Sequence, residues 1–189
     1  RNAGEHRPSV LVIPGSLPKF ADGAVASVDD AADVEVLPLQ EISSALGTRG
    51  VGPEEIAARL QVALGEPQTV RPDLEEILRA RDVVFTDWVD RGAVMTSLMA
   101  EPQTRLVVRF HGVDSLSMWQ FLMDWSRVDD VVFVSEHLQA SVNALIGTQL
   151  EGVRQHVIGN TVDFDRFPAE SSEQAPRTLA LVGWAQKVK

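Results

Sequence analysis

Three residues that could bind a polar ligand, His111, Gly112 and Asp114, follow directly after the mostly apolar run 106–110. We interpret this run as a buried strand and expect a helix over residues 114–126. A strand that leads into a helix places an imidazole and free backbone N–H groups in one crevice. Such a crevice can hold an anion or a polar sugar, so these residues are the first candidates for a functional site.

Similar residues follow the other expected strands. Open parallel sheets bind ligands outside the carboxyl ends of their strands. The residues at these ends are glycines, short hydroxyls and groups useful for binding: Gly15, Ser16, Trp88, Ser135, Glu136 and Asn160. If the strand assignments hold, these residues border the same crevice as His111.

Each candidate also has a structural explanation. His111 can be a core histidine bonded to a carbonyl, and Gly112 can relieve a tight turn. Asp114 is a preferred residue for capping a helix, and Glu136 is favourable in a first helical turn. Trp88 can fill the core.

Apolar runs and helical periodicities alternate along the chain. The sequence predicts strands over 10–13, 34–39, 83–86, 105–110, 131–134 and 154–158, and helices over 24–32, 53–64, 90–100, 114–126 and 135–146, with another starting at Asp73. Continuous apolar strands are typical of a parallel sheet covered on both faces. We therefore predict an α/β fold with a doubly wound, Rossmann-like parallel sheet.

Two expected helices carry specific predictions about which side chains are buried. In the helix that starts at Pro53, residues Ile56, Leu60 and Leu64 fall on one face, which is expected to point inwards. In the helix that starts at Asp73, Ile77 and Leu78 are expected to do the same.

Composition excludes several classes of protein. The net charge is −10 without a basic run, which argues against nucleic-acid binding. There are no cysteines, and the four histidines lack the spacing of metal ligands. No apolar stretch approaches the roughly 18 residues of a membrane span. A cytoplasmic protein that needs no metal is expected, with peripheral membrane contact left open.

The end of the sequence predicts a second domain. Residues 169–177 are polar, contain serine and proline, and are interpreted as a linker after a domain over 1–168. Residues 178–183 then have a buried-strand pattern, and the sequence given ends six residues later. Because a lone strand cannot bury itself, it either joins the first sheet or begins a second domain at 178–189. The linker favours the second explanation.

Four segments resemble the N-terminal half of a GT-B-fold glycosyltransferase of the family-four type. They are the strand and His-Gly-x-Asp segment 109–114, the strand ending in serine at 131–135, the segment 157–167 (Val-Ile-Gly-Asn-Thr-Val-Asp-Phe-Asp-Arg-Phe), and Leu-Val-Gly at 181–183. Their order and spacing agree over residues 82–189. Gly159 and Thr161 replace the family's usual proline and glycine, and Trp184 stands where its phosphate-binding arginine is expected.

The resemblance implies an enzyme that transfers a sugar, such as a hexosyl group, from a nucleotide-sugar donor to a hydroxyl, with retention of configuration and without a metal. This chain would hold the carbohydrate or lipid-linked acceptor, and a C-terminal domain would hold the donor. His111 would be catalytic, close to the reacting sugar. Gly15 and Ser16 would approach the diphosphate or acceptor, and Asn160 would lie near the hinge. Lys189, or alternatively Lys187, would contact the donor phosphate.

Two other functional hypotheses are compatible with parts of the sequence. The chain can be a stand-alone Rossmann-like binding or regulatory module that performs no chemistry, in which case residues 178–183 should join its own sheet. An NAD-dependent enzyme is disfavoured, because residues 14–18 after the first strand lack the glycine fingerprint of dinucleotide binding.

Overall fold

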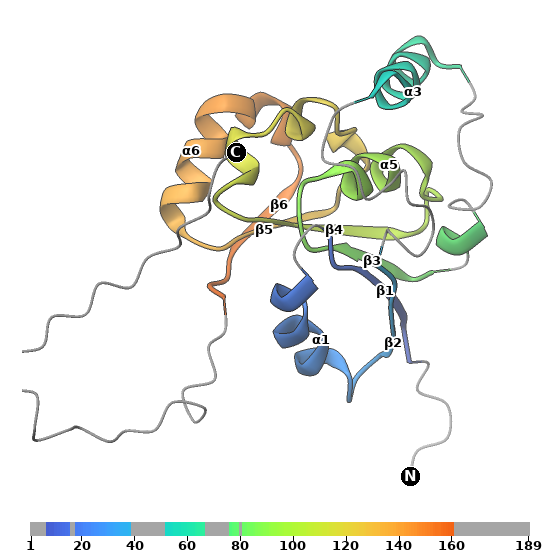
Figure 1. Cartoon of the computed structure of the whole chain (residues 1–189), viewed down its shortest axis with the longest axis vertical. Helices are drawn as coiled ribbons and strands as arrows, with labels where there is room; N and C mark the ends of the chain where they lie inside the picture. The colour runs from blue at the N-terminus through green and yellow to red at the C-terminus, as the bar shows by residue number, and fades with distance from the viewer. Residues whose placement is uncertain (1–6, 16–17, 39–51, 67–75, 80, 161–189) are drawn as a thin grey trace, which may run out of the picture.

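A six-stranded, all-parallel sheet organises the computed structural model, which describes residues 7–15, 18–38, 52–66, 76–79 and 81–160. Figure 1 shows the sheet at the centre of the molecule. The strand order is β2-β1-β3-β4-β5-β6. The strands are β1 (Ser9–Ile13), β2 (Asp33–Val36), β3 (Val83–Thr86), β4 (Arg105–Phe110), β5 (Asp130–Phe133) and β6 (Arg154–Val157).

The chain reverses its direction of travel across the sheet at β1. It first moves to β2 on one side, then returns to β3 on the other side and continues outwards to β6. The parallel register aligns Val12 with Phe85 and Phe85 with Val107. Ligand crevices of doubly wound sheets form at such a reversal, outside the carboxyl ends of the strands. The predicted fold class is confirmed.

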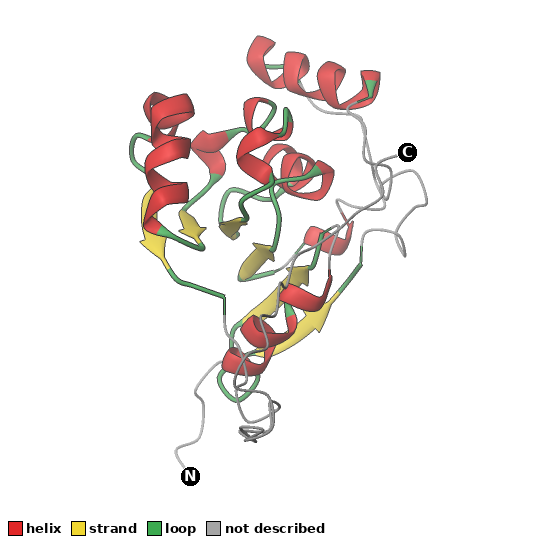
Figure 2. Ribbon diagram, turned by 60° about the vertical axis from the view of Figure 1, so that its left-hand side comes forward, coloured by secondary structure: helices red, strands yellow, loops and turns green. Residues whose placement is uncertain are grey.

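The helices cover the two faces of the sheet unequally. Helices α3 (Pro53–Leu64), α5 (Arg91–Met99) and α6 (Glu136–Ile146) lie on one side, whereas α1 (Asp22–Val28) lies on the other, to the left of β1 and β2 in Figure 1. Figure 2 shows the same separation after rotation. A short 3-10 turn, η1 (Pro18–Phe20), connects β1 to α1.

The core lies between the sheet and the helices α5 and α6. Phe110 on β4 is fully buried and stacks on Trp125 at 5.8 Å and on Phe133 at 5.4 Å. From α6, Val142 and Ile146 pack into the same cluster. Ile77 and Leu78 pack into a neighbouring cluster around Leu11, as predicted, although the helix expected to start at Asp73 begins outside the described residues.

Helix starts follow their sequence signals. Ser135 caps α6, where its Oγ accepts a hydrogen bond from the Leu138 N–H at 3.2 Å. Asp90 caps α5 in the same way through the Gly92 N–H at 2.9 Å. Pro53 occupies the first turn of α3 as expected. These caps fix where α5 and α6 begin relative to the strands before them.

The helix predicted over residues 114–126 is wrong. The segment forms three separate 3-10 turns: η2 (Asp114–Leu116), η3 (Trp119–Phe121) and η4 (Trp125–Arg127). Side chains bind the carbonyls that a continuous helix would need. Ser117 Oγ donates to the Asp114 carbonyl, and the Gln120 amide donates to the carbonyls of Ser115 and Ser117. Such local side-chain bonds compete with helix formation.

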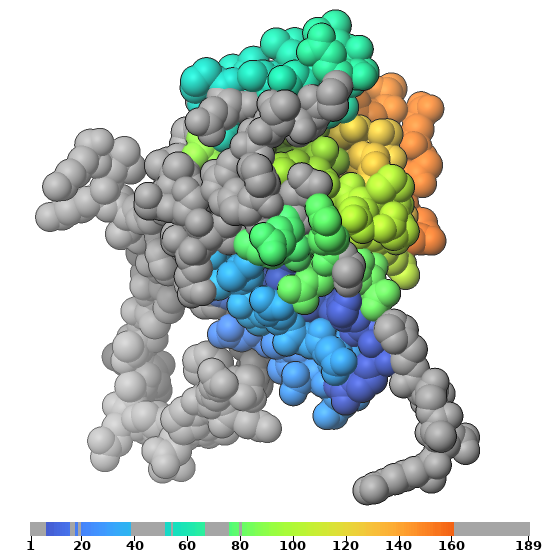
Figure 3. All heavy atoms as spheres, turned by 90° about the vertical axis from the view of Figure 1, so that its right-hand side faces the viewer, coloured from blue at the N-terminus to red at the C-terminus, as the bar shows by residue number. Residues whose placement is uncertain are grey.

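The predicted inward face of α3 is also wrong. Ile56, Leu60 and Leu64 are 47%, 57% and 72% exposed. The helix instead buries Glu55, which forms an ion pair with Arg91 of α5 at 2.7 Å. The buried ion pair turns the apolar stripe outwards. Figure 3 shows α3 at the edge of the molecule, in agreement with this orientation.

A buried carboxylate ties the last three strands together near their amino ends. The side chain of Asp130 on β5 is 3% exposed. It accepts hydrogen bonds from Arg105 of β4 at 2.8 Å and from Arg154 of β6 at 2.9 Å, and its Oδ1 lies 2.8 Å from His156 Nε2. The Arg154 bonds, assisted by those of His156 and Arg105, hold the pKa of Asp130 well below its ordinary value despite burial.

Replacement of Asp130 by asparagine is expected to lower the free energy of unfolding at neutral pH by about 1–3 kcal/mol, because hydrogen bonds to charged groups are lost. The folded pKa lies below the ordinary 3.8, so the ionised carboxylate stabilises the fold above about pH 4, and this stabilisation is lost on further acidification. Urea unfolding across this pH range should show that the free energy of unfolding falls more steeply on acidification in wild type than in Asp130→Asn. Exposed Asp30→Asn is the control, and equal acid slopes in all three proteins would contradict the expectation.

Candidate functional site

Three aromatic rings meet at the carboxyl ends of β3 and β4. Trp88 and His111 stack with ring centroids 4.1 Å apart and an interplanar angle of 16°. Phe20 of η1 lies 5.2 Å from His111 and 6.0 Å from Trp88. Trp88 and His111 are both buried. We call these three residues the aromatic cluster. It brings together two of the predicted site residues, Trp88 and His111.

A buried ion pair lies beside the aromatic cluster. Asp87 is fully buried and pairs with Arg109 Nε through Oδ1, which also lies 3.0 Å from His111 Nε2. The guanidinium of Arg109 donates in addition to the carbonyl of Phe20 and lies over the ring of Phe85. Asp87 and Arg109 therefore connect β3, β4 and η1 through one set of charge-assisted bonds.

Sequence reasoning missed Asp87 and Arg109 as site residues. A signal was nevertheless present, because Arg109 is the single charge within the run 106–110. A charged residue inside a buried strand requires a partner, since an unpaired buried charge is strongly unfavourable. Asp87 follows directly after the neighbouring strand β3 and was the nearest acidic candidate.

Asp114 joins the loops that follow β3 and β4. Its Oδ2 accepts hydrogen bonds from the backbone N–H of His111 at 2.8 Å and of Val89 at 3.2 Å. The side chain does not cap η2, where Val113 is the N-cap residue, so the capping interpretation is wrong. Burial raises the pKa of Asp114 to about 7, opposed by the two backbone bonds and assisted by the nearby charges of Asp90 and Asp87.

Asp114→Asn is expected to change how stability depends on pH. The folded pKa of about 7 lies above the ordinary 3.8, so wild-type stability from this group is full below about pH 4 and falls as the pH rises to about 7. An asparagine oxygen can still accept both backbone bonds without ionising. Urea unfolding at several pH values should therefore show that the free energy of unfolding of the variant rises relative to that of wild type between about pH 4 and pH 7. A constant difference over this range would contradict the raised pKa.

Gly15 lies against the aromatic cluster and cannot be replaced without strain. Its φ of +61° is in the left-handed region that favours glycine. A Cβ at this position would lie 2.8 Å from Trp88 Cβ and Cδ1, and 2.9 Å from Asp90 Oδ2. The predicted site residue Gly15 is thus brought next to Trp88, at the carboxyl end of β1.

Gly15→Ala is expected to lower the free energy of unfolding by about 1–3 kcal/mol and to displace Trp88. Gly65→Ala is a matched control, because Gly65 has a similar φ of +71° and open space where its Cβ would be. The variant at residue 15 should lose more stability in urea unfolding than the variant at residue 65. Equal losses would mean that only the backbone conformation, and not the approach to Trp88, requires glycine.

Apart from Gly112, which directly follows His111 in the chain, the other predicted site residues lie away from the aromatic cluster or outside the described residues. Ser135 and Glu136 are exposed at the start of α6, Asn160 is exposed after β6, and an added Cβ at Gly112 would meet no atom within 4 Å. The structure shows no hydrogen bond, ion pair or ring contact between these residues and the aromatic cluster. The remaining predictions fall on residues outside the described part of the chain: Ser16, Lys187, Lys189, the linker 169–177 and the strand 178–189.

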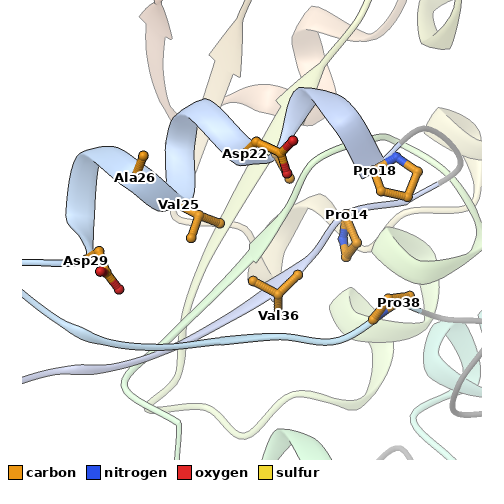
Figure 4. Close-up of a pocket in the computed structure, with 9 residues that line it drawn as sticks. Pro14, Pro18, Asp22, Val25, Ala26, Asp29, Val36 and Pro38 are labelled. Atoms are coloured by element: carbon orange, nitrogen blue, oxygen red, sulfur yellow. The ribbon is translucent and has the colours of Figure 1, made fainter.

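An open groove of about 320 Å³ lies between α1 and the ends of β1 and β2. Figure 4 shows Val25, Val36, Pro14 and Pro38 around it, with Asp29 at one end and Asp22 on the α1 side between Val25 and Pro18. The lining is mostly apolar. The groove adjoins the aromatic cluster through the backbone, because its lining residue Ala21 follows Phe20.

The described residues offer no metal site and no membrane span. No three histidine or acidic side chains among them are grouped so that they could hold an ion. None of the helices in the described part of the chain is both long and apolar enough to cross a bilayer.

Comparisons of the chain with protein-family models, with curated proteins and with solved structures found no match. These comparisons therefore assign no family to the chain.

Proposed function

We propose that this chain is the acceptor-binding half of a retaining glycosyltransferase that moves a sugar from a nucleotide-sugar donor to an acceptor hydroxyl. The observation that carries the proposal is the meeting of Gly15, Trp88 and His111 at the carboxyl ends of β1, β3 and β4. An imidazole beside an aromatic ring and a glycine turn suits a polar, ring-shaped ligand such as a sugar.

The reaction makes specific physical demands on such a site. Charge develops on the leaving diphosphate, and it must be met by donors that are already in place. Under the proposal, the backbone around Gly15 comes close to the diphosphate or the acceptor, where a side chain would obstruct it. The donor nucleotide is held by a second domain, to which Lys187 and Lys189 contribute. The chain described here is therefore proposed to be inactive by itself.

The groove beside α1 is a candidate binding place for the acceptor. Its volume is in the range of small-molecule sites. Its mostly apolar lining, with the carboxylates of Asp22 and Asp29, can contact both the apolar ring face and the hydroxyls of a carbohydrate. A ligand in the groove would lie next to the segment that carries Phe20, and so close to the aromatic cluster.

One observation favours the alternative, a stand-alone binding or regulatory module without catalysis. The side chain of His111 is only 5% exposed, and its ring is held by Asp87 and Trp88. A histidine with a purely structural role would have the same surroundings. The two functions differ in what the loss of the imidazole does, because a structural role affects stability while a catalytic role affects turnover.

The experiment that tests the proposal is an assay of the native, full-length protein with a panel of nucleotide-sugars and hydroxyl acceptors. We expect transfer with retained anomeric configuration, read by proton NMR of the product. His111→Ala should reduce turnover by about 100-fold or more, the magnitude expected when a group that acts on the reacting centre is lost. The exposed His137 of α6 provides a control, and His137→Ala should leave turnover unchanged.

Two outcomes would overturn the proposal or part of it. If His111→Ala keeps turnover within about twofold of wild type, far below the 1.4 kcal/mol of a tenfold effect, His111 has no part in the mechanism. If the full-length protein binds and consumes no nucleotide-sugar, the enzyme hypothesis fails and the binding module becomes the better description. Urea unfolding of each variant separates a loss of fold from a loss of chemistry.

A further inference from the structure

The ring of His111 is held in one orientation. It stacks on Trp88 at 4.1 Å and lies 5.2 Å from Phe20, while the backbone N–H of the same residue donates to Asp114 at 2.8 Å. In an interior packed this closely, the ring cannot turn over about its Cβ–Cγ bond, which would put Cε1 in the place of Nε2, unless Trp88 moves. The direction of Nε2 is therefore fixed.

Nε2 points at a group that can only accept a hydrogen bond. It lies 3.0 Å from Oδ1 of Asp87, and the same oxygen accepts a hydrogen bond from Nε of Arg109. A carboxylate beside a guanidinium accepts hydrogen bonds and donates none. The hydrogen between His111 and Asp87 must then be carried by Nε2, because the partner of a ring nitrogen sets the tautomer.

The second ring nitrogen of His111 is Nδ1. Among the described residues, none forms a hydrogen bond with Nδ1 of His111. In a neutral imidazole with its hydrogen on Nε2, Nδ1 carries a lone pair and accepts. We propose that Asp87, held by Arg109, fixes His111 as the Nε2–H tautomer and so makes Nδ1 a hydrogen-bond acceptor for a hydroxyl of the ligand.

This assignment narrows the role of His111, and the identity of its ligand rests on the proposed function. With its hydrogen directed at Asp87, the neutral ring cannot donate to the leaving diphosphate. It accepts a hydrogen bond from a hydroxyl of the transferred sugar or of the acceptor. Asp87 and Arg109 are positioning residues, which act on the ligand only through His111. Stabilisation of the leaving group must come from backbone N–H groups and the donor half.

The test is a two-bond proton–nitrogen NMR correlation of the histidine side chains in the ¹⁵N-labelled chain, which distinguishes the two tautomers and the protonated ring. The signals of His111 are identified by their loss in His111→Gln. We expect a single Nε2–H pattern in wild type. In Asp87→Asn, the amide can present either its oxygen or its NH₂ group to the ring, so the single pattern should be replaced by a mixture or by the Nδ1–H form.

Wild-type signals with the proton on Nδ1 would overturn the inference, and so would a folded Asp87→Asn variant with an unchanged pattern. The exposed Asp30→Asn variant controls for a general effect of charge and should match wild type. If Asp87→Asn does not fold, the wild-type spectrum alone still decides the tautomer.

The measurement needs no substrate, so its result can contradict the inferred tautomer without contradicting the proposed function, and the reverse. An Nε2–H pattern in a protein whose full-length form transfers no sugar would support the role of Asp87 and contradict the proposed enzymatic function. An Nδ1–H pattern in an active glycosyltransferase would contradict the role of Asp87 and support the proposed enzymatic function.

Discussion

A charge pair shielded from water, Asp87 with Arg109, sets the geometry on which the candidate site depends. A buried pair is tolerated only when further hydrogen bonds satisfy its atoms, because both ions lose their hydration. Here the extra partners are the ring of His111 and the carbonyl of Phe20, while Oδ2 of Asp87 has no hydrogen-bond partner in the described part of the chain. Each one brings a different part of the chain to the same place. The requirement to satisfy one buried salt bridge thus draws two strands and the η1 turn around a single imidazole.

A second carboxylate completes the arrangement from the backbone side. Asp114 binds the main chain of His111 and Val89, so the two loops at the carboxyl ends of β3 and β4 keep a constant separation. Burial, and to a lesser extent the charges of Asp90 and Asp87, disfavour the ionised form of Asp114, so the site combines close packing with unfavourable electrostatics. These buried carboxyl groups lower the stability of the fold while they hold the loops in one geometry. Such arrangements are common at functional sites.

The sequence was sufficient for the sheet and insufficient for contacts between distant side chains. Apolar strands and the cap Ser135 depend on neighbouring residues, so their patterns predicted β1, β3 to β5 and the start of α6. The turns over 114–127 were missed because periodicity counts apolar positions and ignores the carbonyl bonds of Gln120. The orientation of α3 was missed because it depends on Arg91, which is distant in sequence from Glu55. Asp87 as the partner of His111 was missed as well, because the only signal for it was the charge of Arg109 inside a buried strand.

The close approach of Gly15 to Trp88 also constrains how this sequence can change over time. A side chain at residue 15 would collide with Cβ and Cδ1 of Trp88 and with Oδ2 of Asp90. Every residue except glycine at position 88 keeps a Cβ, so replacing the tryptophan alone does not free position 15. The constraint therefore acts in one direction. An evolving lineage can change residue 88 while the glycine stays, but a change at residue 15 is strained whatever ring residue 88 carries.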